Sequence, residues 1–209
     1  MEIIGAQGWI DNPWEVYRVL RDLPVPVLAD SMFAPALKAT EHRDTMFWEL
    51  ERGVLGKVLP PHYQHRGTCV SQGYARATQH LIQAEILASE REEWRGRVLQ
   101  AGYYGFSRVE VGGGRINGDG SVGAWAAKAA KDYGVLLKVK TGKYDFTGDD
   151  DDLYCVDWGR SGVPDDLEPT AKMHCVSDVS QVSDAEMGAA CIYNYKPIPV
   201  CSNQGFTTQ

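Results

Sequence analysis

The sequence lacks several features that would assign it to a class at once. No apolar run approaches the roughly 18 residues that a membrane-spanning helix needs. Residues 1–7 contain no basic region followed by an apolar block, so no secretory signal is visible. Positive charge is in deficit, because 28 acidic residues outnumber 21 Lys and Arg and the net charge is −7. Such a balance disfavours binding to a nucleic-acid backbone. We therefore expect neither a membrane nor a nucleic acid among the partners.

Cysteine pairs with the spacing of a metal or redox site are also missing. The chain has five cysteines, an odd number that without a secretory signal favours reduced thiols over a disulfide framework. No two of them have the C-x-x-C spacing of a zinc or thioredoxin-like site. A glycine-rich stretch, residues 112–120, lacks the Gly-Lys-Ser/Thr ending of a phosphate-binding loop. The sequence therefore predicts no metal and no cofactor.

What is present indicates one soluble α+β domain. The 209 residues fit a single domain, and 22 Gly with 10 Pro would be hard to place in a simple helical bundle. We expect residues 1–60 to form a covering arm and residues 61–209 to form the main domain. The periodicity predicts helices at 13–20, 45–52, 69–91, 122–133 and 184–192, strands at 107–111 and 196–201, and a loop-rich stretch over 141–170.

Cys69 has a setting with chemical meaning, because it falls in the first turn of the longest predicted helix. The N–H groups and dipole of a helix N-terminus favour the thiolate, which is the nucleophilic form of cysteine. The same N–H groups can donate to a developing oxyanion. The loop before the helix adds the side-chain amide of Gln64 and the imidazoles of His62 and His65. Spacing alone makes Cys69 a candidate nucleophile and no more.

The segment Gln64-x-x-Gly67-Thr68-Cys69-Val70, followed by an amphipathic helix, resembles the nucleophile segment of papain-like cysteine peptidases, closest to divergent bacterial and phage-encoded members. Later stretches resemble that family too: Gly120-Ser121, Tyr133-Gly134-Val135, Pro197-x-Pro199-Val200 and Ser202–Phe206. The resemblance spans residues 60–209 and implies a papain-like α+β fold, with a helical lobe led by the Cys69 helix and a lobe of strands from the C-terminal half. It implies Cys69 as nucleophile and Gln64 as oxyanion donor, although the spacing between them is about one residue shorter than in the family.

The catalytic base is where the sequence departs from the family. A papain-like site needs a histidine roughly 130–150 residues after the cysteine, and no histidine follows His174. Three explanations compete. The histidine lies on a segment beyond Gln209, or the chain has lost catalysis and kept the fold, or His174, His62 or His65 acts from another position. We name Cys69, Gln64 and His174 as the candidate catalytic residues.

Two functions from different classes follow. The first is a thiol hydrolase that cleaves a peptide or amide bond of a peptide or protein substrate through Cys69. The second is a catalytically inactive structural or interaction protein of the same fold, for example a phage particle component with protein assembly partners. The expected location is cytoplasmic or virion-associated.

Overall fold

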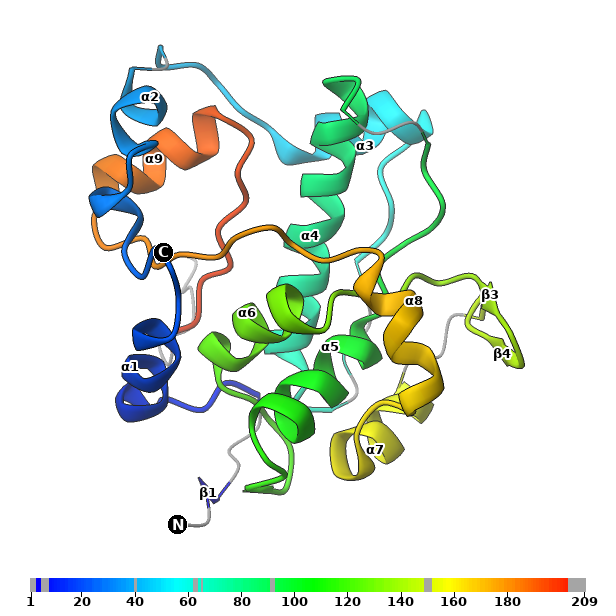
Figure 1. Ribbon diagram of the computed structural model, residues 1–209. Coiled ribbons are helices and arrows are strands. Elements are labelled where there is room, and N and C mark those ends of the chain that lie inside the picture. The colour runs from blue at the N-terminus through cyan, green and yellow to red at the C-terminus, as the bar shows by residue number, and fades with distance from the viewer. Residues whose placement is uncertain are drawn as a thin grey trace, which may run out of the picture.

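The computed structural model describes residues 3–4, 8–39, 41–61, 64, 66–90, 93–148 and 152–202. It combines helices with short strands, and the helices dominate (Figure 1). The helices are α1 (Pro13–Arg21), α2 (Ala34–Lys38), α3 (Phe47–Leu55), α4 (Cys69–Leu87), α5 (Gln100–Phe106), α6 (Gly123–Asp132), α7 (Asp152–Ser161), α8 (Glu168–Lys172) and α9 (Ala185–Tyr193). Strand β1 (Ile3–Ile4) pairs in parallel with β2 (Ile116–Asn117), and β3 (Lys140–Thr141) pairs antiparallel with β4 (Tyr144–Asp145).

The long helix α4 forms the middle of the molecule, with α5 and α6 packed against it (Figure 1). Apolar side chains of α4, α6 and the strand-like segment around 135–137 form one cluster, which includes Val70, Ile82 and Val135. A second cluster joins α5 to α7, where Phe106 is fully buried and stacks on Tyr133 at 5.2 Å between ring centroids. The first of these clusters, which contains Val70 and Ile82, fixes the orientation of α4 and with it the position of its first residue.

Helix α1 is held on α6 by one buried carboxylate. Asp11 and Asn12 are both residue types that can cap a helix beginning at Pro13, and it is Asn12 that accepts a hydrogen bond from the backbone N–H of Glu15. The Glu15 carboxylate accepts hydrogen bonds from Arg115 Nη1 at 2.7 Å and from Trp125 Nε1 at 3.0 Å. Hydrogen bonding by Arg115 is the largest cause that lowers the pKa of Glu15 to about 2. The N-terminal segment is therefore fastened to α6 by an ionised group.

A buried arginine organises the glycine-rich loop between α5 and α6. The Arg108 guanidinium donates to the carbonyls of Gly159, Gly120 and Gly118 at 2.9, 2.5 and 2.6 Å. A fourth hydrogen bond, from Nη2, reaches the Ile116 carbonyl at 3.3 Å. Four backbone acceptors from two separate segments thus converge on one side chain. Because an unpaired buried carbonyl is costly, this arrangement fixes the course of residues 116–120.

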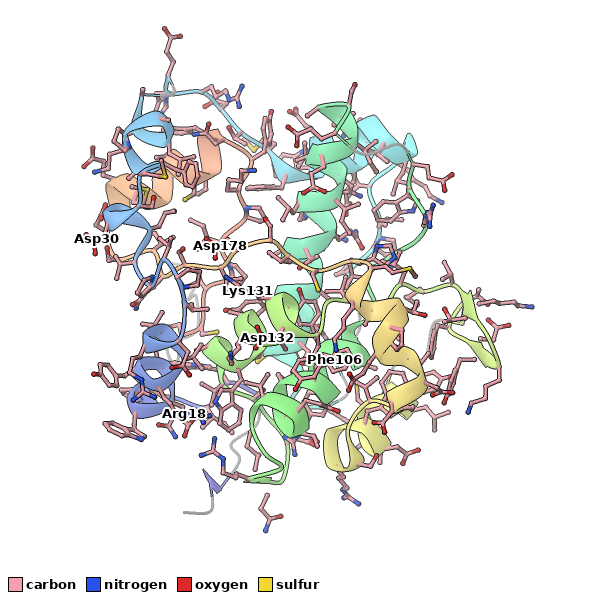
Figure 2. All side chains as sticks on the ribbon, viewed as in Figure 1. Arg18, Asp30, Phe106, Lys131, Asp132 and Asp178 are labelled. Carbon is pink, nitrogen blue, oxygen red and sulfur yellow. The ribbon has the colours of Figure 1, made fainter. Side chains whose placement is uncertain are left out.

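The segment that joins α8 to α9 runs across α6. The N–H of Val176 donates to the Ala130 carbonyl at 3.1 Å, and Lys131 forms an ion pair with Asp178 at 2.9 Å. Figure 2 shows Lys131 and Asp178 together where this segment passes over the helix. Beyond it, α9 packs on α2 at one side of the molecule (Figure 1).

Most of the predicted helices are confirmed, but the predicted strands in the second half are wrong. Residues 107–111 continue α5 as a turn of π-helix, because Ser107 and Arg108 are drawn into the interior. Residues 196–201 form no strand. Residues 152–172 are mostly helical rather than loop, because Tyr154 and Trp158 pack on the α5 cluster. Within the described residues, the C-terminal half therefore supplies helices and one short strand pair in place of the expected lobe of strands.

Candidate functional site

Cys69 is the first residue of α4, as the periodicity predicts, and its thiol is exposed and free. Thr68 occupies the N-cap position, but its side chain makes no capping hydrogen bond. Its hydroxyl instead accepts from the side-chain amide of Gln72 at 3.2 Å, although threonine is a common capping residue at this position. The backbone N–H groups in the first turn of this 19-residue helix therefore donate no hydrogen bond to the Thr68 side chain.

The backbone of Gly8 lies directly against the sulfur of Cys69. A Cβ atom at position 8 would stand 2.6 Å from Sγ, closer than any real contact, and the φ angle of Gly8 is +111°. The segment is held there by Ser121, whose N–H donates to the Gly8 carbonyl at 2.9 Å and whose carbonyl accepts from Ile10 at 3.0 Å. Only glycine allows this approach of the N-terminal segment to the thiol.

The glycine-rich loop brings a carboxylate to the turn that precedes Cys69. Asp119 Oδ2 accepts from the backbone N–H of Gly67 at 3.4 Å, and Asp119 Oδ1 accepts from the hydroxyl of Tyr104 at 3.4 Å. Burial raises the pKa of Tyr104 to about 12, so its hydroxyl stays protonated at neutral pH and donates. Asp119 is thereby fixed beside the loop that leads into α4. No local pattern in the sequence marks Asp119, because only the fold brings residue 119 to residue 67.

A second thiol lies close by. A Cβ atom at Gly123 would stand 2.8 Å from Sγ of Cys201 and 3.8 Å from the hydroxyl oxygen of Tyr74. Cys201 packs against the apolar cluster of α4 that includes Val70. Burial raises the pKa of the Cys201 thiol, and the neighbouring Cys69 raises it further. The sequence around Cys69 gives no sign of Cys201, because Cys201 lies near the C-terminal end of the described chain.

Gln64 is the one predicted oxyanion donor, and the structure places it outside the protein interior. Its side chain is exposed, and its Nε2 donates to the backbone carbonyl of Arg66 at 2.7 Å. Gln64 is therefore engaged within its own loop. His62 and His65, the two loop histidines of the sequence analysis, lie outside the described residues.

The structure places the candidate base His174 in the wall of a pocket near the second half of α4. His174 lines this pocket of about 270 Å³ together with Ile82 and Leu137. Ile82 follows Cys69 by thirteen residues in α4, which corresponds to roughly 20 Å along the helix axis at a rise of 1.5 Å per residue. A base must come within hydrogen-bond reach of the proton that it takes. The position of His174 therefore gives no support to its role as the base for the Cys69 thiol.

The two remaining described histidines have structural surroundings. His80 lies in the buried face of α4 and packs against Phe47 of α3, with 5.4 Å between ring centroids. Burial lowers the pKa of His80, so its neutral form is favoured at pH 7. His42 contacts the ring of Tyr193 at 4.8 Å. Neither contact places an imidazole at the start of α4.

Neither a metal-binding cluster nor a membrane-spanning helix is found in the part of the chain that the structure describes. Within it, no group of three or more His, Cys, Asp or Glu side chains is arranged to hold a metal ion. Among the same residues, no helix has both the length and the apolar character needed to cross a bilayer.

Comparison with known proteins returns no relative. The chain matches no family model, no curated protein and no solved structure.

Proposed function

We propose that the chain is a papain-like thiol hydrolase that cleaves a peptide or amide bond through Cys69. The observation that carries this proposal is the exposed sulfur of Cys69 at the first residue of the 19-residue helix α4. The thiolate attacks the carbonyl carbon of the scissile bond, and the first-turn N–H groups of α4 donate to the resulting oxyanion. The amine leaves with a proton, and water then hydrolyses the thioester to release the acid and restore the thiol.

The reaction requires a base that takes the thiol proton, and an imidazole is the usual one. We do not assign the base to His174, which lines the pocket that includes Ile82, or to His80, which is buried against α3. Within the 209 residues, His62 and His65 are the histidines nearest to Cys69 in sequence. We assign the base to this loop, and we retain the papain-like architecture as part of the same proposal.

The test is selective covalent labelling by a peptidyl vinyl sulfone at pH 7, with the modified residue located by mass spectrometry. Cys175 is the matched control, because it is also exposed and burial raises the pKa of its thiol. We expect Cys69 to react at least about ten times faster than Cys175, since a thiolate is the reacting species. The variants His62→Ala and His65→Ala should identify the base by slowing the labelling of Cys69. Equal labelling of all cysteines in the folded protein would exclude the proposal.

A specific observation favours the second candidate, a catalytically inactive interaction protein of papain-like fold such as a phage particle component. No histidine of the described residues lies at Cys69, while α1 exposes two aromatic side chains. Trp14 and Tyr17 are 68% and 58% exposed, with 5.8 Å between their ring centroids. This candidate predicts self-association or partner binding that persists in Cys69→Ala. Peptide cleavage that is abolished by the same substitution would exclude it.

A further inference from the structure

Two thiols lie near the short segment that leads into α6, Cys201 against Gly123 and Cys69 against Gly8, which is hydrogen-bonded to that segment. The sulfur of Cys69 faces Gly8, and the Gly8 carbonyl is hydrogen-bonded to the N–H of Ser121 at 2.9 Å. Two residues further along the chain, Gly123 faces the sulfur of Cys201. The two sulfurs therefore share one small region, although they come from the beginning of α4 and from the far end of the described chain.

The packing of Cys201 supports the same placement. It contacts the apolar cluster that includes Val70, the residue next to Cys69, and its sulfur lies near the hydroxyl of Tyr74 on the following turn of α4. Cys201 belongs to no helix or strand, so a disulfide, with its bond length of about 2 Å, need not break a helix or strand hydrogen bond at this residue.

The other cysteines have different surroundings. Cys155 is buried in the cluster between α5 and α7, and Cys191 is buried in the cluster between α2 and α9. Cys175 is exposed on the segment that crosses α6. Among the five cysteines, Cys69 and Cys201 are thus the pair that the fold brings together.

We propose that Cys69 and Cys201 form a reversible disulfide after a hydroperoxide oxidises Cys69. In the first step the Cys69 thiolate attacks the peroxide, an S–O bond forms, the O–O bond breaks, and an alcohol or water leaves. The sulfur of Cys69 is oxidised by two electrons to a sulfenic acid, and the peroxide is reduced. In the second step the Cys201 thiolate attacks this sulfur, the S–S bond forms, and the S–O bond breaks to release water. A low-molecular-weight thiol reverses the reaction by disulfide exchange.

This redox site goes beyond the proposed hydrolase and does not depend on it. In the disulfide the sulfur of Cys69 is bonded to the sulfur of Cys201. Every reaction of the Cys69 thiol therefore stops until the disulfide is reduced. The crosslink is measured by mass alone, so its absence leaves the hydrolase proposal standing, and a failed hydrolase assay leaves the crosslink untouched.

The experiment treats the full chain with equimolar hydrogen peroxide at pH 7 and digests it without reductant. Chymotrypsin can cut after Tyr195, which separates Cys191 from Cys201. A crosslink to Cys201 is then distinguished from a crosslink to Cys191. We expect one crosslinked species that joins the Cys69 and Cys201 peptides, with an intact mass lower by two hydrogens. Dithiothreitol should restore both free peptides.

Two serine variants complete the design. In Cys201→Ser we expect dimedone to trap a sulfenic acid on Cys69, because the second thiol is gone. In the matched control Cys175→Ser we expect the same crosslink as in the native chain. A crosslink to another cysteine, a crosslink between two chains, or equal dimedone trapping on Cys69 in the native chain and Cys201→Ser would overturn the proposal.

Discussion

The substitution Glu15→Gln tests how firmly the N-terminal segment is fastened to α6. Glu15 is buried and paired with Arg115 at 2.7 Å and Arg18 at 2.8 Å, and these partners help to lower its pKa from 4.5 to about 2. At 1.36 kcal/mol per pKa unit this corresponds to about 3 kcal/mol of folding free energy. Both arginines remain partly in water, so we expect Glu15→Gln to cost about 2 kcal/mol at pH 7.

The contribution of Glu15 to folding stability decreases at low pH. Because the folded-state pKa of Glu15 is lowered, its contribution to stability is complete above pH 4.5 and is lost as the pH falls towards 2. The difference in unfolding free energy between the native chain and Glu15→Gln should therefore shrink to about half at pH 3. Urea unfolding followed by tryptophan fluorescence at pH 7 and pH 3 measures both values.

The control is Glu93→Gln, which removes an ion pair to Arg95 in which both side chains are more than 60% exposed. An exposed pair of this kind contributes roughly 0–1 kcal/mol. A cost for Glu15→Gln that equals that of the control, or that is the same at pH 7 and pH 3, would refute the reasoning.

Substitutions at Gly8, Arg108 and Gly134 give three further predictions. Gly8→Ala should slow alkylation of Cys69 by iodoacetamide several-fold, because a Cβ atom would stand 2.6 Å from its sulfur, whereas Gly73→Ala in α4 meets open space and should leave the rate unchanged. Arg108→Met should cost about 3 kcal/mol in urea unfolding, since it leaves buried carbonyls without their charged donor. Gly134→Ala should lower Tm by roughly 5–10 °C, because its φ is +79° and a Cβ atom would stand 2.0 Å from a carbonyl oxygen at the end of α8; an unchanged Tm would contradict this.

Local signals in the sequence locate the predicted helices, α1, α3, α4, α6 and α9, but not α2, α5, α7 and α8. Asn12 before Pro13 marks the start of α1, and the glycine at position 134 follows the end of α6 in the left-handed conformation that such a residue adopts. The regular spacing of apolar residues after Cys69 predicts α4 from its first residue. In each case the information lies within a few residues of the boundary.

Where the sequence interpretation failed, distant contacts decided the structure. The alternation of Val109, Glu110 and Val111 is typical of a strand, yet these residues continue α5 because Arg108 reaches carbonyls on two other segments. The neighbours of Cys69 escaped detection for the same reason. Gly8 and Cys201 lie far from it in the sequence, and no local pattern connects either residue to a helix start.

The residues around Cys69 come from distant parts of the chain, and this affects how the protein can be produced. Its surroundings draw on residues 8–10, 67–69, 119–123 and 201, so during synthesis on the ribosome the thiol emerges long before Cys201 does. A nascent chain that has not yet released Cys201 presents Cys69 without its second thiol. A recombinant fragment that starts at residue 61 lacks the Gly8 backbone that lies on the sulfur. Expression trials that trim either end of the described chain will therefore alter the environment of Cys69 before they disturb the central helices.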